Sequence, residues 1–418
     1  MVGDGQSSTE QYVEDLFDQS YAALDSDMEA SLSYAKEAFA IAEDKGFDWH
    51  QANALFIQGY VFHEQGQHSK AILLYLDAVR ILEQLSDDRS KKDQTKILIN
   101  CANILRDHHK YDDAIELYDD ALSLANNYQY DGYEKRLIMV FYNKSSTYKI
   151  KGEYDLAIEE AMKAHDLAVI ENDQRMVVQV WNKIGLINYL NNHYDEAIKY
   201  YQTILESSFP AIDVRSHKAN AYHNIAEVQV ELKNFDEAEK SFLKAIDLYQ
   251  SIQLNRNLFV SYKQLCALYL AQKKYDSARE MGDLALAIYD EMPLEFDNFS
   301  LFKLLSDLNF QTGQYAQVKE FGDRYHDENQ AFIEETKFIS QQSNAFKIDV
   351  VLAGYYEQIA SREQVASLTN WLIAVLLLAL TIIGLGYWRW KWIKTQLEAE
   401  LRAHFKELAE IFTPINVE

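Results

Sequence analysis

Small and aromatic residues recur along most of this 418-residue chain at spacings that fit pairs of packed helices. An aromatic residue, Asp, a variable residue and Ala form a short motif, which begins at Tyr111, Tyr154, Tyr194, Phe235 and Tyr275. The successive intervals are 43, 40, 41 and 40 residues, and a small residue stands twelve positions before each Ala: Ala102, Ser145, Gly185, Ala226 and Cys266. Because small residues let two helices approach closely, the pattern predicts one helix on each side of a turn at the motif.

The same pattern continues upstream and downstream of these five units. Ala71 with Tyr75 extends the series upstream, and Tyr315 with Val318 extends it downstream. The Asp of each motif is well suited to capping the second helix of its pair. The recurring motif resembles the tetratricopeptide repeat over about residues 12–330, although its units are longer than the standard repeat of about 34 residues. The resemblance implies an all-α solenoid of helical hairpins over residues 1–330, with about seven or eight units of 40–43 residues.

In this family the first helix of each unit lines a concave face, which is where a protein or an extended peptide binds. Asn at matching sites holds the main chain of the ligand, because an amide both donates and accepts hydrogen bonds. The alternative is that Asn is simply tolerated at exposed helix sites. Counting from the small residue of each unit, we expect the groove-facing side chains to include Asn100, Asn103, Asn143, Asn182, His223, Asn224 and Lys263.

Charged residues refine this expectation. Binding the carboxylate of a peptide's C-terminus needs several basic residues in the groove, and only Arg106, Lys149 and Lys263 are near, so such a ligand is not favoured. Acidic residues of the second helices, such as Glu159 and Glu160, are expected to lie exposed on the opposite face.

One segment near the carboxyl end has a different composition. Residues 364–388 contain no charged residue, and Trp371 and Trp388 flank their apolar centre. A bilayer-spanning helix needs about 20 apolar residues and commonly has aromatic residues at its ends. The pattern predicts one transmembrane helix over residues 368–390, in contact with the lipid bilayer. Three basic residues follow directly, Arg389, Lys391 and Lys394, and they favour a cytoplasmic carboxyl end with a short helix over residues 391–418.

This orientation places the repeats outside the cytoplasm, yet the sequence after Met1 has no basic or apolar export signal. Either the chain is a mature or trimmed form, which we favour, or it is inserted from its tail with the repeats in the cytosol. Residues 331–367 read as a long juxtamembrane helix with apolar residues seven apart: Phe332, Ile339, Phe346, Ala353 and Ala360. This row predicts either a helix that caps the last repeat or half of a coiled-coil seam, so the helices flanking the membrane are candidates for a homodimer contact.

Composition excludes several functions. Asp and Glu number 65 against 40 Lys and Arg, and a formal charge of −25 argues against direct nucleic-acid binding. Cys101 and Cys266 are too far apart to suggest a disulfide framework or a metal site. His63 and His68 are five residues apart, so they do not share a helix face as zinc-protease ligands do, and we interpret them as polar turn residues. No catalytic, cofactor-binding or metal-binding motif is found, and we expect the chain not to be an enzyme.

The order of these segments resembles the receptor half of bacterial membrane regulators, in which tetratricopeptide repeats precede a single span and an output module. That resemblance implies the sensory part of a signal-transduction or transcription-regulating membrane protein, with the output module absent here. Two alternatives remain open: a membrane-tethered adaptor or assembly scaffold without signalling output, and a sensor histidine kinase fragment that lacks its catalytic domain.

Overall fold

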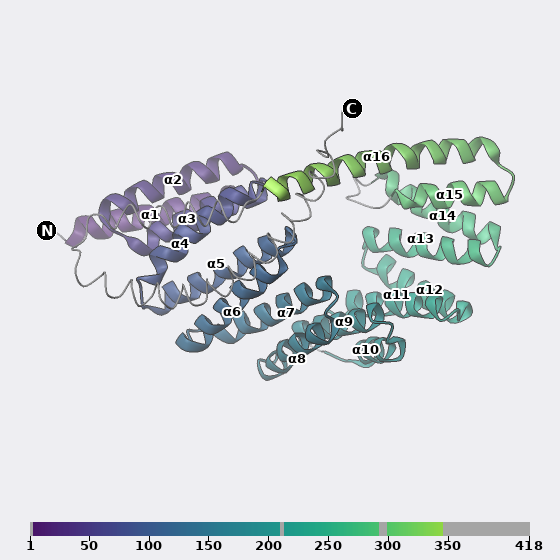
Figure 1. Cartoon of the computed structure of the whole chain (residues 1–418), viewed down its shortest axis with the longest axis horizontal. Helices are drawn as coiled ribbons and strands as arrows, with labels where there is room; N and C mark the ends of the chain where they lie inside the picture. Colours follow the sequence, from purple (N-terminus) through teal and green to yellow (C-terminus); the bar gives the residue numbers. More distant parts are fainter. Residues whose placement is uncertain (1–2, 210–212, 292–298, 346–418) are drawn as a thin grey trace, which may run out of the picture. The chain divides into compact units, whose positions relative to one another are not determined.

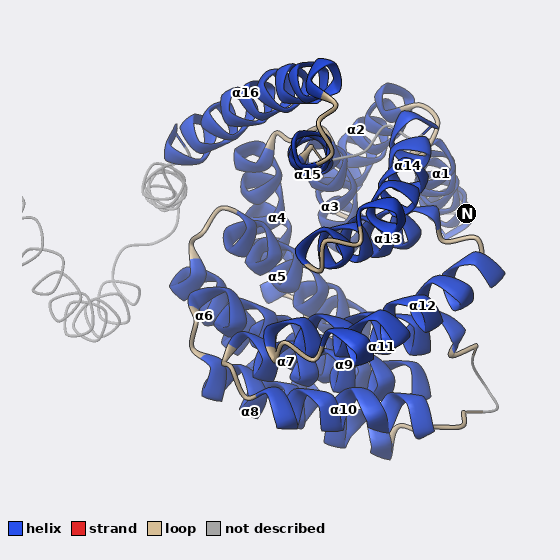
Figure 2. Ribbon diagram, turned by 90° about the vertical axis from the view of Figure 1, so that its right-hand side faces the viewer, coloured by secondary structure: helices blue, strands red, loops and turns tan. Residues whose placement is uncertain are grey.

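The computed structural model describes residues 3–209, 213–291 and 299–345, and this part of the chain is built from sixteen α-helices without a strand (Figures 1 and 2). The predicted all-helical solenoid is confirmed, and eight helical pairs agree with the upper end of the expected number of units. The helices are α1 (Gly3–Ala23), α2 (Met28–Lys45), α3 (Asp48–Glu64), α4 (His68–Glu83), α5 (Asp88–Asp107), α6 (Tyr111–Tyr128), α7 (Tyr133–Lys151), α8 (Tyr154–Ile170), α9 (Gln174–Leu190), α10 (Tyr194–Glu206), α11 (Arg215–Glu231), α12 (Phe235–Ser251), α13 (Asn255–Ala271), α14 (Tyr275–Glu291), α15 (Ser300–Gln311) and α16 (Tyr315–Ala345).

The helices pack in chain order as hairpins, each on the next. The first helices of successive units also contact one another directly, as α5 does with α7, α9 with α11 and α13 with α15. The first helices therefore form a continuous side of each stretch of the array, which is how the inner helices of a solenoid pack. We call this side, formed by the odd-numbered helices, the first-helix face.

The small and aromatic residues of the motif hold each hairpin together, as predicted. Ala197 and Ala238 are fully buried, and so are the corresponding alanines of the neighbouring units. Gly185 of α9 faces Tyr201 of α10 so closely that a Cβ atom at residue 185 would lie 2.5 Å from Cε1 of the Tyr201 ring. The pair Gly59 and Tyr75 repeats this contact between α3 and α4, with a closest distance of 2.6 Å. The glycine thus supplies the space that the buried tyrosine ring fills.

The predicted capping role of the motif Asp is wrong. Each second helix from α6 to α14 begins at the aromatic residue of its motif, so the Asp is the second helical residue and not the N-cap. The preceding residues, such as Lys110 and Glu153, make no side-chain cap. The turn bends instead at a left-handed residue two positions before the aromatic residue, for example Gly152 with φ 81°. In the first turn the Asp carboxylate still interacts favourably with the helix dipole.

The last helix continues through the position where we predicted a domain boundary. α16 extends from Tyr315 to Ala345, past residue 330, and the described segment ends within the predicted juxtamembrane helix. The seam side chains of residues 331–367, the predicted span 368–390 and the predicted helix 391–418 lie outside the described part. None of the sixteen described helices combines the length and the apolar character that a membrane crossing requires.

Candidate functional site

All seven side chains proposed for the groove lie on first helices. Asn100 and Asn103 are on α5, Asn143 is on α7 and Asn182 is on α9. α11 carries His223 and Asn224, and α13 carries Lys263. His223 is buried, and the other six are half-buried.

A hydrogen-bonded ladder connects the first helices of successive units. In each unit the donor is the side chain two positions before the small residue. The acceptor is the side chain one position after the small residue of the preceding unit. Asn143 donates to the Oδ1 atom of Asn103 at 3.2 Å, and Gln264 donates to Oε1 of Glu227 at 3.3 Å. Between these two rungs, Lys183 donates to Oγ of Ser146. The ladder therefore follows the repeat register across α5, α7, α9, α11 and α13.

The unit of α11 departs from this rule for a visible reason. Asn224 has the donor position, but the acceptor position of the preceding unit is the apolar residue Leu186. Asn224 donates to Oδ1 of Asn182 instead, at 2.9 Å. The Asn row predicted from the sequence therefore consists of two bonded pairs, Asn103 with Asn143 and Asn182 with Asn224. The rung of Lys183, between α7 and α9, lies between these two pairs along the ladder.

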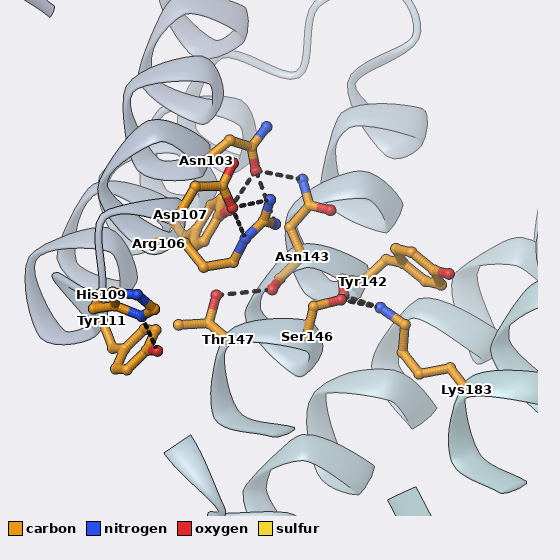
Figure 3. Close-up of polar contacts among 11 residues, drawn as sticks. Asn103, Arg106, Asp107, His109, Tyr111, Tyr142, Asn143, Ser146, Thr147 and Lys183 are labelled. Atoms are coloured by element: carbon orange, nitrogen blue, oxygen red, sulfur yellow. Dashed lines mark hydrogen bonds and ion pairs between the residues drawn. The ribbon is translucent and has the colours of Figure 1, made fainter. Parts of the chain in front are cut away.

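Asn103 is the acceptor of three donors (Figure 3). Its Oδ1 atom accepts from the hydroxyl of Tyr118 at 2.5 Å, from Asn143 and from Arg106 at 3.3 Å. Arg106 also forms an ion pair with Asp107 at 2.9 Å. Burial raises the pKa of Tyr118 to about 12, so its hydroxyl stays protonated and donates at neutral pH. This oxygen is thus fully engaged within the protein.

Lys183 has the most unusual environment on this face. Its Nζ atom donates to the backbone oxygen of Tyr142 at 2.6 Å and to Ser146, and it lies 3.0 Å from the centroid of the Tyr142 ring (Figure 3). The residue is only 6% exposed. Burial is the main cause that lowers the pKa of Lys183 to about 6, and the positive charges of Lys149 and Arg106 lower it further. A buried ammonium is unfavourable without a compensating charge.

Lys149 and Arg106 make this part of the face positively charged. Lys149 is half-buried on α7, one turn beyond Ser146. Its pKa is lowered by burial and then by the charge of Arg106. Arg106, Lys149 and Lys183 come from three successive first helices, and we call them the basic cluster.

Two further predicted residues, His223 and Lys263, make structural contacts. His223 forms a hydrogen bond with Oγ of Ser261 at 2.9 Å, and its ring packs edge-on against Phe242. Lys263 donates to Oγ of Ser300 at 2.9 Å. These bonds connect α11 to α13 and α13 to α15, so both residues strengthen contacts between units.

The expectation for Glu160 is wrong, whereas Glu159 is exposed as predicted. Glu160 is 6% exposed, and its carboxylate lies 3.6 Å from the ammonium of the buried Lys144, which also pairs with Asp119 at 2.6 Å. Lys144 of α7 is thus paired with carboxylates, whereas among the described residues no carboxylate forms an ion pair with Lys183.

His63 and His68, which we interpreted as polar turn residues, pack together with His108 across two units. His68, at the start of α4, forms a hydrogen bond with His108, which follows α5, and the ring of His63 lies 5.1 Å from that of His68. Burial lowers the pKa of both His68 and His108, and neighbouring histidines lower both further. Across the described residues, no His, Cys, Asp or Glu side chains are grouped so that they could hold a metal ion.

Sequence reasoning missed Lys183 and its partner Ser146. Lys183 is two residues before Gly185, the position at which α5, α7, α11 and α13 have Asn100, Asn143, Asn224 and Gln264. At this position Lys183 is the one cation in a row of amides, and the repeat register identifies it. The predicted row of Asn residues included its neighbour Asn182 instead.

Comparisons with known proteins agree with this architecture. Two family models described as tetratricopeptide repeat match the chain, one over residues 217–291 and the other over residues 140–168 and 178–209. The chain therefore contains tetratricopeptide repeats in a helical solenoid, a fold used for protein interaction. No curated protein sequence matches it.

Solved structures with similar folds share little sequence with this chain. A signal transduction ATPase with a tetratricopeptide repeat sensor from Pyrococcus horikoshii is 16% identical, with a TM-score of 0.54 over 81% of this chain and 50% of that one. The apo form of the quorum sensor NprR from B. thuringiensis is 16% identical, with a TM-score of 0.46 over 75% of this chain and 99% of that one. A tetratricopeptide repeat protein from Parabacteroides merdae is 19% identical, with a TM-score of 0.45 over 70% and 98% of the two chains.

Proposed function

We propose that this protein is a membrane-anchored receptor that binds a partner protein, through an extended segment of it, on the first-helix face. The observation that carries the proposal is the ladder of half-buried amides on successive first helices. Each bond of the ladder fixes a side chain through one of its N–H groups. In these bonds Asn143 and Asn224 donate, so the rungs do not use their amide oxygens. Amide oxygens fixed on the first helices suit the backbone N–H groups of an extended peptide.

Binding assays with three classes of variant test this proposal. Replacing Asn143, Asn182 and Asn224 together by Ala removes three amide groups and two rungs of the ladder. We expect the triple variant to lose capture of partners from solubilised membranes, with unchanged helix content by circular dichroism. Replacing Glu159 of α8 by Gln changes an exposed side chain on the other side of the hairpin and serves as the matched control. Equal capture by the triple variant and the parent would contradict binding on this face.

Membrane anchoring is a further part of the proposal. It is supported by the uncharged residues 364–388 and the basic residues directly after them. On this view residues 368–390 cross the bilayer, the carboxyl end is cytoplasmic and the repeats are outside the cytoplasm. The flanking helices are candidates for a homodimer contact. Reporter fusions at Met1 and Glu418 test the topology, and an exported reporter at Glu418 would contradict it.

A sensory role completes the proposal. The repeat part of the Pyrococcus horikoshii protein is described as a sensor, and here the same type of array precedes a predicted span. We propose that binding on the repeats is transmitted across the membrane and that the chain acts by binding and not by catalysis. The alternative is an adaptor that docks its partner without an output. Measuring whether a captured partner changes the dimerisation of the carboxyl end, by fluorescence transfer between labels there, separates the two roles.

A further inference from the structure

We propose that a cleft at the turns of two neighbouring units binds a lysine side chain of a partner protein, together with an aliphatic residue beside that lysine. The cleft has a volume of about 300 Å³, which is within the range of ligand-binding pockets. We call it the turn cleft, and its lining residues are Gly152, Glu153, Tyr154, Asp155, Leu156 and Asn191. None of these residues belongs to the amide ladder, so the inference does not rest on the proposed function.

Two turns of the same conformation form the cleft. The turn between α7 and α8 bends at Gly152, with φ 81°, and the turn between α9 and α10 bends at Asn192, with φ 60°. α8 packs directly on α9, so the start of α8 and the end of α9 meet at this edge of the array (Figures 1 and 2). Asp155, the motif Asp of α8, and Asn191, the residue that follows α9, therefore line one cleft.

At the two preceding joints between units, the residue before the left-handed bend reaches back to the start of the preceding second helix. His108 forms a hydrogen bond with His68, the first residue of α4. Lys151 forms an ion pair with Asp112, the motif Asp of α6, at 2.7 Å. A lysine is therefore a side chain that this fold itself uses to pair with a motif Asp across a joint.

The joint between α8 and α9 lacks this contact. Asn191 stands directly before the bend, as Lys151 does one unit earlier, and Asp155 corresponds to Asp112. Within the described ranges, no ion pair or side-chain hydrogen bond connects Asn191 or any cation to Asp155. The turn cleft thus presents the carboxylate of Asp155 without the lysine that pairs with its counterpart.

The charge balance at the cleft selects a cationic ligand. Glu153 and Asp155 both line the cleft. Lys151 pairs with Glu153 at 2.8 Å, but its single charge is shared with Asp112 at 2.7 Å. The carboxylates therefore outnumber the ammonium group, so a lysine of a partner is attracted and an acidic side chain is repelled.

Exposed aliphatic side chains border the cleft. Leu156, which lines it, is 43% exposed, and Leu190, the last residue of α9, is 42% exposed. Ile150, near the end of α7, is 51% exposed. A lysine buries its methylene stem against apolar surface while its ammonium stays at a polar group. The combination of Asp155 with exposed leucines fits a lysine stem, and an aliphatic neighbour of that lysine would cover the remaining apolar surface.

Leucine methyl groups report binding in the full chain. The protein is purified in detergent, labelled in its leucine methyl groups and titrated by NMR with three five-residue peptides that are blocked at both ends. The first has a central Lys between two Leu residues, the second has Gln in place of the Lys, and the third has Ser in place of both Leu residues. We expect the first peptide to shift the signals of Leu156 and Leu190, and the other two to bind about threefold to fivefold more weakly. Equal binding of the Lys and Gln peptides would overturn the proposal.

Two variants assign the charge effect to this cleft. N191K supplies the cleft with a lysine of its own, at the position from which Lys151 reaches Asp112, and it should abolish the shift of Leu156 by the Lys peptide. D155N keeps the size of the side chain and removes its charge, so it should bind the Lys and Gln peptides equally. D236N makes the same change at the motif Asp of α12 and should respond like the parent. A parent-like response of N191K or D155N, with unchanged helix content, would contradict a lysine site here.

A matched pair of leucine variants tests the apolar part of the surface. L190S should weaken binding of the Lys peptide, measured at the signal of Leu156. L243S changes a leucine of α12 that is 46% exposed, and it should leave this binding unchanged. Equal weakening by both variants would assign the response to non-specific apolar contact and would overturn the proposal.

The triple variant of Asn143, Asn182 and Asn224 separates the turn cleft from the proposed function. It leaves the lining of the cleft unchanged, so the Lys peptide should shift Leu156 as in the parent. If this shift is seen while the triple variant still captures partners normally, the ladder function fails and the turn cleft remains. If capture is lost and the Lys peptide shifts neither Leu156 nor Leu190 of the parent, the ladder function holds and the turn cleft is overturned.

Discussion

Two rungs of the ladder, one between α7 and α9 and one between α11 and α13, have the same geometry and opposite electrostatics. In the second, Gln264 donates to the carboxylate of Glu227, which also lies 3.5 Å from Nε2 of His223. In the first, Lys183 donates to the neutral hydroxyl of Ser146, and the two charges that lower its pKa, those of Lys149 and Arg106, are positive. A neutral donor with an acidic acceptor is replaced by a basic donor with a neutral acceptor. The shared hydrogen bonds belong to the repeat fold, whereas the charges are specific to each pair of units.

Removing the lysine should have the largest effect on stability. The pKa of Lys183 is about 6 in the folded protein against 10.5 for an ordinary lysine, so folding at pH 7 must release a proton. The folded state therefore gains stability as the pH rises toward 10.5. We expect K183Q to stabilise the unit of α9 by about 2–4 kcal/mol at pH 7 and to lose this advantage near pH 10. Hydrogen exchange of the α9 amides in the full chain measures it.

The matched change in the other ladder sharpens this test. N224K places a lysine at the corresponding position of α11, next to Asn182. This variant should destabilise the unit of α11, whereas K183Q should stabilise the unit of α9. A destabilised K183Q variant at pH 7 would contradict the assignment of Lys183 as a buried, uncompensated base.

Replacing the small residues by larger ones should destabilise the units of α9 and α11 to a similar extent. G185L forces a side chain against the buried Tyr201 ring, and A226L does the same in the next unit. We expect each change to cost about 1–3 kcal/mol through overpacking. Because contacts in a solenoid are local, faster hydrogen exchange should be confined to the altered unit and its neighbours. Loosening that is uniform from end to end would contradict this description of the array.

The histidine cluster should make the units of α3 to α6 sensitive to acid. The pKa values of His68 and His108 are lowered from 6.5, so the folded state favours their neutral forms. Their contribution to stability is complete above pH 6.5 and is lost as the pH falls below it. Hydrogen exchange of α4 and α5 at pH 7.5 and pH 5.5 measures the effect. H68Q should reduce the difference between the two pH values, and an unchanged difference would rule out the cluster as its source.

A single rung of the ladder should have the smallest effect. N143A removes the bond to Asn103, whose oxygen still accepts from Tyr118 and Arg106, so the expected loss is about 0.5–1.5 kcal/mol. E159Q changes an exposed side chain and should change stability by less than about 0.5 kcal/mol. Chemical denaturation of both variants in parallel compares them, and equal stabilities would show that the rung contributes nothing.

Much of the fold could be predicted because its signals are local and repeated. The interval between Tyr194 and Phe235 and the small residues before them set the helix pairs, and the buried contact between Gly185 and Tyr201 follows from the same spacing. The capping role of the motif Asp was wrong because a left-handed turn residue, and not a side chain, ends the turn.

The site was harder to predict because it depends on contacts between units. The position of Lys183 is visible in the sequence only when its register is compared with that of Asn143 and Asn224. That no carboxylate of the described residues pairs with it depends on three helices together. Glu160 shows the same limit, since its burial depends on Lys144 of the preceding helix. A pattern that identifies one face of a helix does not identify the charges that the next helix places against it.

Site-specific photocrosslinking tests the central claim most directly, namely that partners bind on the first-helix face. A photoreactive amino acid is placed in the full chain at Asn100, which is half-buried on α5, or at Leu243, which is 46% exposed on α12. The account predicts that a partner crosslinks at residue 100 and that residue 243 gives no crosslink. Crosslinks that form at residue 243 and not at residue 100 would contradict it.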